Sequence, residues 1–187
     1  MNLQSFDKSG LASNDIEVKN IVATLDLDVE LDLSYLDAQF PHTSYEPQRY
    51  PSLIFRPEGL PTLLITNSGI ILFTGGDSIE SVYEAYQKVT REFNNIGLDI
   101  SSKEEEIQIQ NIVSTFEIDR ELDLSYISVK LGLEQTEYEP EQFPGVIYRI
   151  ENGPVALLFS SGKIIITGEK SSDGILSAVE TIQHLIQ

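Results

Sequence analysis

The segment LLFSSGKIIITG at residues 157–168 has the pattern of a β-hairpin, and a variant of it, LITNSGIILFTG, occurs at residues 64–75. Each copy contains two runs of apolar and β-branched residues, which a Ser-Gly pair separates. The second copy carries Phe159 and Lys163 at positions where the first copy has threonine and isoleucine. The chain therefore repeats a hairpin but changes two of its most exposed positions.

The repetition extends over most of the chain. Residues 16–36 align with residues 107–127, and twelve of these 21 positions are identical. Residues 45–75 align with residues 138–168, and 14 of these 31 positions are identical. The period is too long for a solenoid, whose repeats have roughly 20–45 residues. The alignment therefore indicates a duplicated half with pseudo-twofold symmetry.

We expect four parts along the chain. These are a frayed polar tail (1–15), a first repeat (16–98), a solvated linker (99–106) and a second repeat (107–187). In each repeat a strand is followed by a short helix, for which Asp32 or Asp123 is the expected N-cap residue. Gly132 suits the C′ position of the second of these helices.

Each repeat ends in an amphipathic helix. The apolar positions of these helices share one stripe: Val82, Tyr86, Val89 and Phe93 in the first, and Ile175, Val179, Ile182 and Ile186 in the second. Strands followed by one long helix, twice over, predict an α+β fold with an antiparallel sheet whose helices lie on one face.

The other face of the sheet is expected to be open but not polar. In the second hairpin Leu158, Ile164 and Ile166 alternate with Phe159 and Ile165, so that both faces carry apolar residues. One interpretation is that a second chain or a loop buries this face. The other is a binding surface. The hairpin and first-strand positions of this face carry Asn, Ser, Thr, Val and Ile, together with aromatic tips and isolated cations, and hold no carboxylates. This composition favours binding to the minor groove of DNA.

Composition excludes several other classes of protein. The chain has no cysteine, which rules out disulfides and thiolate metal sites, and His42 and His184 are far apart in the sequence, so we expect no metal and no cofactor. No apolar segment is long enough to cross a membrane. A Gly-rich phosphate loop and an ordered catalytic triad are both missing, which argues against an enzyme. The net charge of -18 taken alone argues against nucleic acid.

The motifs IQNIV, YEPEQFPGVIYR and LLFSSGKIIITG resemble the signature of the TATA-box-binding protein family in its archaeal form. The resemblance covers residues 16–187. It implies a saddle made of two repeats, in which a curved antiparallel sheet grips the DNA minor groove and helices cover the convex face. The family is itself a standard example of minor-groove binding and DNA kinking.

The resemblance implies a complete DNA-binding set in the second repeat. Asn111 and Val113 match central groove contacts, Phe143 and Phe159 match the pair that wedges into a base step, and Arg149 and Lys163 match phosphate contacts. The remaining matches are Pro144, Ser161, Ile165 and Thr167.

The first repeat departs from this pattern. The kept or tolerated positions are Asn20, Val22, Arg56, Ser68, Leu72 and Thr74. Tyr50 occupies one wedge position, whereas Thr66 at the other is too small to unstack a base step. Ile70 replaces the phosphate-binding lysine. We therefore expect a shallower kink and one phosphate contact fewer in the first half.

The resemblance also implies partners. The loop that contains Glu139, Glu141 and Gln142 matches the site that binds transcription factor B, which in turn recruits RNA polymerase. The alternative is that this loop is an ordinary solvated loop. The expected DNA partner is an A/T-rich double-stranded promoter, and no membrane is involved. Family members can also form homodimers without DNA.

Two interpretations of function remain open at this point. The first is a general transcription initiation factor that bends promoter DNA and recruits transcription factor B. The second is a divergent relative that binds DNA weakly and regulates through protein partners, which Thr66 and Ile70 favour. In either case we expect a cytoplasmic, nucleoid-associated protein.

Overall fold

The computed structural model describes residue 3, residues 6–100 and residues 103–186. These residues form two compact units. Unit 1 comprises residue 3, residues 20–100 and residues 103–110, and unit 2 comprises residues 6–19 and 111–186. The boundary falls inside strands β1 (Glu17–Asp26) and β6 (Gln108–Glu117), so each unit includes a short segment of the other repeat.

Unit 1 contains an antiparallel sheet with the strand order β2-β3-β4-β5-β1. Its further elements are α2 (Leu33–Gln39), β2 (Thr43–Ser44), β3 (Leu53–Phe55), β4 (Thr62–Ile65), β5 (Ile70–Gly76), α3 (Ile79–Asn95) and the 3-10 turn η2 (Glu104–Glu106). The side chain of Asp32 accepts a hydrogen bond from the backbone N–H of Tyr35 at 3.0 Å, which confirms it as the N-cap of α2.

Unit 2 repeats this arrangement with the strand order β6-β10-β9-β8-β7. Its elements are α1 (Lys8–Ala12), α4 (Leu124–Leu131), β7 (Thr136–Glu137), β8 (Gly145–Arg149), β9 (Val155–Phe159), β10 (Lys163–Glu169) and α5 (Ser172–Ile186). Asp123 caps α4 through the N–H of Tyr126 at 3.1 Å, and Gly132 ends this helix with a φ of +98°. The N-cap expectation is confirmed, whereas Gly132 occupies the C-cap position of α4 and not C′. Its positive φ carries little cost for glycine.

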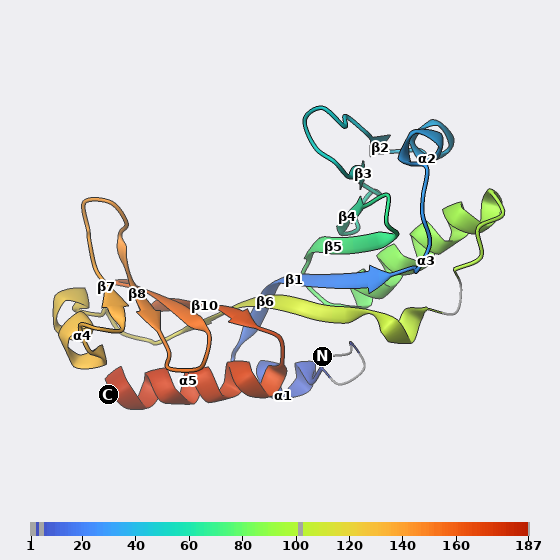
Figure 1. The fold of residues 1–187 in the computed structure, drawn as a ribbon. Coiled ribbons are helices and arrows are strands. Elements are labelled where there is room, and N and C mark those ends of the chain that lie inside the picture. Colours follow the sequence, from blue (N-terminus) through green and yellow to red (C-terminus); the bar gives the residue numbers. More distant parts are fainter. Residues whose placement is uncertain (1–2, 4–5, 101–102, 187) are drawn as a thin grey trace. The chain divides into compact units, whose positions relative to one another are not determined.

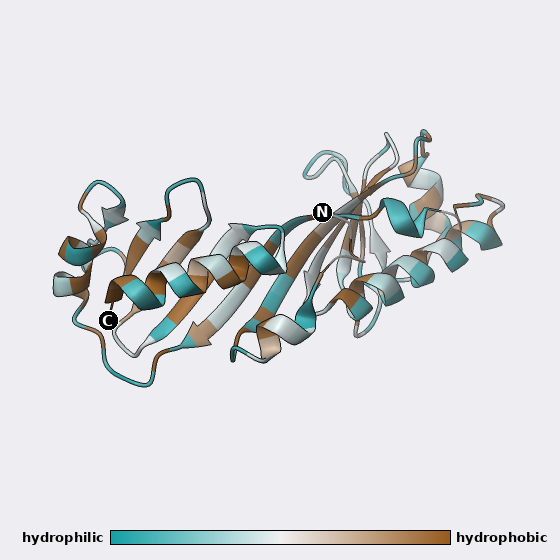
Figure 2. Ribbon diagram, turned by 90° about the horizontal axis from the view of Figure 1, so that it is seen from below, coloured by the Kyte–Doolittle hydropathy of each residue, from teal (hydrophilic) through white to brown (hydrophobic). Residues whose placement is uncertain are grey.

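The long helices cover one face of each sheet, as the sequence predicts. In unit 1, α3 packs on β5, and in unit 2, α5 packs on β10 and runs along one side of the strands (Figure 1). All eight predicted helix-stripe residues are buried. Hydrophobic and hydrophilic residues alternate along the strands and around α5 (Figure 2). Leu158, Ile164 and Ile166 are fully buried beneath the helices, which identifies the opposite face as the open one.

The N-terminal tail differs from the expectation of a frayed segment. Residues 8–12 form helix α1, which packs on α5 and buries Leu11. Asp7 caps α1 by accepting from the N–H of Gly10, and its own N–H donates to the hydroxyl of Ser172 at 3.1 Å. Leu11, an apolar residue in a mostly polar stretch, is thus part of the core of unit 2.

The linker is also less solvated than predicted. Ile100 is buried, and its carbonyl accepts a hydrogen bond from the hydroxyl of Tyr86 at 2.9 Å. Residues 101 and 102 lie outside the described residues. Over the described ranges, no helix has both the length and the apolarity needed to span a membrane.

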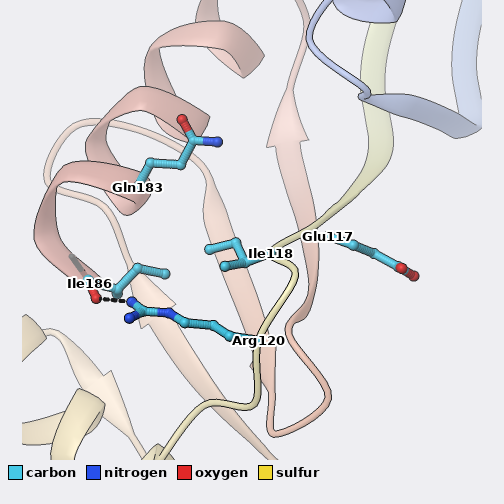
Figure 3. Close-up of a pocket in the computed structure, with 5 residues that line it drawn as sticks. All are labelled: Glu117, Ile118, Arg120, Gln183 and Ile186. Carbon is cyan, nitrogen blue, oxygen red and sulfur yellow. Dashed lines mark hydrogen bonds between the residues drawn. The ribbon is translucent and has the colours of Figure 1, made fainter.

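A hollow of about 470 Å³ lies between the C-terminal end of α5 and the loop after β6 (Figure 3). Arg120 reaches across it and donates to the carbonyl oxygen of Ile186 in the last turn of α5, while Glu117 points away. A cation on a C-terminal carbonyl is a common helix-capping arrangement. The hollow is therefore accounted for by helix capping and is not a candidate site.

Candidate nucleic-acid interface

The open face of each unit has an uncharged centre. Its half-buried side chains in unit 1 are Asn20, Val22, Thr24, Ile54, Thr62, Leu64, Thr66, Leu72 and Thr74. In unit 2 they are Asn111, Val113, Ile147, Val155, Leu157, Phe159, Ile165 and Thr167. Such a face loses little hydration of charged groups when another surface covers it. It is therefore suited to contact with a surface that is itself weakly polar, such as sugar edges and base edges.

A β-bulge orients the asparagine at the start of each open face. Gly75 in β5 and Gly168 in β10 have φ values of +87° and +98°, at points where the pairing with β1 and β6 shifts register. The N–H of Gly75 donates to Asn20 Oδ1 and that of Gly168 donates to Asn111 Oδ1, each at 2.8 Å. Because the amide oxygen is occupied by the backbone, the side-chain NH₂ group is presented as the donor. In Asn111 one N–H of this group donates to Thr167 Oγ1 at 3.4 Å, which leaves the other for a ligand. The minor-groove edges of A·T pairs carry acceptors.

In unit 2 the predicted wedge pair comes together. The rings of Phe143, in the loop before β8, and Phe159, at the end of β9, have centroids 5.7 Å apart and planes inclined at 64°. Gly145 lies beneath them: a Cβ atom built on it would be 3.0 Å from Phe143 Cε1 and 3.3 Å from Phe159 Cδ1. The missing side chain of Gly145 thus leaves room for the two rings.

Unit 1 has no such pair. Tyr50 is 44% exposed, and Ser52 occupies the position equivalent to Gly145. Thr66 instead braces the hairpin turn, because its hydroxyl accepts from the N–H of Ile70 at 3.0 Å and lies 3.0 Å from the hydroxyl of Ser68. The small residue at the wedge position therefore has a local structural role.

The predicted cations lie at the edges of the open faces. Arg56 follows β3 in unit 1, and Arg149 ends β8 in unit 2; both are exposed. Lys163 begins β10 and is exposed, whereas its counterpart Ile70 is 39% exposed and offers no charge. Among the described residues, no carboxylate forms an ion pair with Arg56 or Lys163, so both are available to an anionic ligand.

Carboxylates at the margins correct the expectation that the open face carries none. Asp26 ends β1 opposite Ile70, and Glu117 ends β6 opposite Lys163. Directly opposed residues of an antiparallel pair point to the same face. The expectation of no carboxylates at the first-strand positions is therefore wrong for the last residue of each first strand.

A lysine from the linker partly neutralises the acidic margin of unit 1. Lys103 Nζ lies 2.7 Å from Asp28 Oδ2 and 3.4 Å from the carbonyl oxygen of Asp26. The hydrogen bond that Lys103 donates to the Asp28 carboxylate raises the pKa of Lys103 above its ordinary value, so this side chain stays charged at neutral pH.

The two loops before β3 and β8 have the same backbone shape. The N–H groups of Arg49 and Tyr50 both donate to the carbonyl oxygen of Glu46, and those of Gln142 and Phe143 both donate to that of Glu139, each at 2.9 Å. Glu139, Glu141 and Gln142 are exposed, and Gln142 donates to the carboxylate of Glu139. The predicted partner-binding residues are thus presented to solvent.

The other predicted site residues lie on or beside the open faces. Ser68 and Ser161 are exposed in the hairpin turns, Pro144 is exposed next to Phe143, and the remaining strand positions are half-buried as described above. Two residues were missed by sequence reasoning. Glu137 in β7 forms an ion pair with Arg149, and Gly145 underlies the aromatic pair. Comparison with Ser44 and Ser52 at the equivalent positions of the first repeat would have drawn attention to both.

A model of the family described as transcription factor TFIID, or TATA-binding protein, matches residues 15–96 and again residues 106–187. The chain is 39% identical over 170 residues to TATA-box-binding protein B of Halobacterium salinarum, an alignment that covers 90% of this chain and 91% of the relative. It is 36% identical over 171 residues to the TATA-box-binding protein of Archaeoglobus fulgidus, covering 90% and 93%.

Among solved structures, the Methanococcus jannaschii protein of the same family matches with a TM-score of 0.83 and 36% sequence identity. The match covers 92% of this chain and 98% of that chain. Together with the antiparallel sheets and the helices described above, it confirms the predicted α+β fold class.

Proposed function

The chain belongs to the TATA-binding protein family, and from this premise we propose that it is a general transcription initiation factor that binds TATA-box DNA in the minor groove. Its place in the family makes it a DNA-binding transcription factor and not an enzyme. The alternative of a divergent regulator with weak DNA binding is not favoured, because relatives aligned over 90% of the chain are TATA-box-binding proteins.

One observation carries the proposed mode of binding: the bulge glycines Gly75 and Gly168 hold Asn20 and Asn111 with their NH₂ groups presented as donors. A·T and T·A pairs both offer acceptors in the minor groove, whereas a G·C pair adds a donor that would oppose these amides. The residues around them, Val22 and Val113, are suited to apolar contact with sugars. The arrangement therefore favours A/T-rich sites.

The periphery of each face supplies the remaining contacts in this proposal. Phe143 and Phe159 insert into a base step, and Arg56, Arg149 and Lys163 bind phosphates. The centres of the open faces carry no carboxylate, and the net charge of -18 opposes nonspecific binding, which makes the groove contacts decisive for where the protein binds. Binding then takes place at the nucleoid, in the cytoplasm.

We further propose that the exposed loop with Glu139, Glu141 and Gln142 binds transcription factor B and so brings RNA polymerase to the promoter. Exposed carboxylates provide electrostatic steering toward a basic partner surface. Without DNA, the weakly polar open faces can also associate in a homodimer, since an apolar surface of this kind is stabilised when it is covered.

The substitution Asn111→Asp tests the proposed groove contact. Aspartate keeps the oxygen that accepts from Gly168 but replaces the NH₂ donor with a negative charge. We expect binding to a TATA-box duplex to weaken at least about tenfold in a gel shift, since a good base contact contributes about 1–3 kcal/mol. Asn152→Asp, in an exposed turn, is the control with the same change of charge and should bind as the wild type.

Equal affinity of the wild type for a TATA-box duplex and a G/C-substituted duplex would contradict the proposal. The partner proposal is tested in the same gel by adding transcription factor B, which should produce a slower complex with the wild type. Replacing Glu139 and Glu141 together with glutamine should remove this slower complex without weakening the binary one. Retention of the slower complex would exclude this loop as the partner site.

A further inference from the structure

Arg149 already has an anionic partner within unit 2. Its Nη2 atom donates to Glu137 Oε1 at 2.9 Å. Glu137 pairs in register with Ile147, two residues before Arg149, so its side chain lies on the open face at the edge strand β7. Each of the two side chains is 59% exposed, which leaves the ion pair accessible to a competing anion.

The first repeat provides a natural comparison. Ser44 pairs with Ile54 as Glu137 pairs with Ile147, and the N–H of Arg56 donates to the carbonyl oxygen of His42 at 2.9 Å. The N–H of Arg149 makes the equivalent bond to Gln135 at 2.8 Å. The two arginines therefore make the same backbone hydrogen bond to the edge strand, and the carboxylate partner of Arg149 is one difference between them.

We propose that Glu137 is a built-in competitor for the phosphate-binding arginine of unit 2, which a DNA phosphate must displace before Arg149 can contact it. This inference rests on the proposed function, because it takes Arg149 to be a phosphate contact. It also changes how the two units compare in the number of cations available to phosphates. Within the described residues, each open face then presents one phosphate-binding cation that forms no ion pair with a carboxylate, Arg56 in unit 1 and Lys163 in unit 2. The loss of lysine at Ile70 is matched by the masking of Arg149.

The physical cost of displacement is small but measurable. Exposed ion pairs are weak and are screened by salt, so a phosphate can replace the carboxylate. When it does, the freed Glu137 takes up a counterion from solution. This uptake cancels the counterion that Arg149 releases from the DNA, and the contact then adds little to the salt dependence of binding.

The substitution Glu137→Ser, which introduces the residue found in the first repeat, tests the inference with the full-length protein and a TATA-box duplex. We expect about fivefold tighter binding at low salt, a salt slope steeper by about one, and convergence with the wild type at high salt. Glu134→Ser removes the same charge from the turn before β7, where no cation pairs with Glu134 among the described residues, and should leave the slope unchanged. Thermal unfolding of both variants should match the wild type.

Two further kinds of variant separate the effect of the carboxylate–arginine ion pair from the effect of the protein's net charge. Ser44→Glu should impose the same masking on Arg56 and weaken binding about fivefold at low salt. Glu137→Ser in an Arg149→Gln background, and Ser44→Glu in an Arg56→Gln background, should have little effect, since coupling is lost when the cation is gone.

The outcomes distinguish this inference from the proposed function. If the wild type does not bind the TATA-box duplex, the proposed function fails. If the wild type binds and Arg149→Gln weakens binding, but Glu137→Ser changes neither affinity nor slope, the competitor role alone is wrong. An equal gain from Glu137→Ser and Glu134→Ser would also overturn it, because the gain would then reflect net charge.

Discussion

Single residues set the difference between the two open faces. Asn20 and Asn111 accept the same hydrogen bond from a bulge glycine, but around them the first repeat carries Tyr50, Thr66 and Ile70 where the second has two phenylalanines and a lysine. Ile70 stands opposite Asp26, so this corner of unit 1 combines a missing cation with a carboxylate. An approaching phosphate meets repulsion there that Lys103 offsets only in part.

Ile70→Lys restores the cation at this corner. We expect about fivefold tighter binding to TATA-box DNA at low salt and a salt slope steeper by about 0.9, because one more phosphate is neutralised. Ile70→Gln, which has a polar side chain without charge, serves as the control and should leave the slope unchanged. Affinities measured by fluorescence anisotropy over a range of salt concentrations give both quantities; an unchanged slope for the lysine variant would place this residue away from the backbone of the DNA.

At the level of elements, the hairpins are held by glycines in their turns. Gly162 has a φ of +91°, and a Cβ atom built on it would lie 2.2 Å from the carbonyl oxygen of Ile118 and 2.6 Å from that of Arg120. Gly69 in unit 1 meets the carbonyl oxygen of Val29 in the same way at 2.4 Å. The turn therefore packs directly against the backbone of the segment that follows the first strand of each repeat.

Gly162→Ala is expected to destabilise unit 2 by about 3 kcal/mol, because the new methyl group adds a steric clash to an unfavourable φ. Gly59→Ala also introduces alanine at a positive φ, +71°, but no atom lies within 4 Å of its Cβ position, so it should cost about 1 kcal/mol. Urea unfolding followed by circular dichroism measures both values. Similar losses for the two variants would show that the close backbone approach at Gly162 is relieved at little cost.

For the whole molecule, duplication followed by divergence predicts an asymmetric effect on DNA. Unit 2 has an aromatic pair over Gly145, whereas the equivalent positions of unit 1 hold Tyr50, the turn-bracing Thr66 and Ser52 in place of the glycine. An apolar side chain that is inserted between bases partly unstacks the step and kinks the duplex. We therefore infer a stronger kink at the second repeat than at the first.

The paired substitution Thr66→Phe with Ser52→Gly rebuilds the aromatic pair of unit 1 around Tyr50. We expect the bend angle from circular-permutation assays to increase, and a 2-aminopurine placed at the first-repeat base step to become unstacked. Thr66→Val with Ser52→Gly removes the same hydroxyls without adding a ring and should leave both readings near the wild type. A wild-type complex with two equally unstacked steps would contradict the inferred asymmetry.

Local patterns in the chain were sufficient for the duplication, the fold class, the helix caps and the identity of the open face, because residue alternation and capping depend on neighbours in the sequence. Four features could not be predicted in this way. They are the burial of Leu11 and Ile100, the contact of Phe143 with Phe159 over Gly145, the hydrogen bond from Gly168 to Asn111 and the ion pair of Glu137 with Arg149. Each depends on the register of strands or the packing of segments distant in the sequence. Register and packing are decided by the total burial of the folded unit, which no local pattern contains.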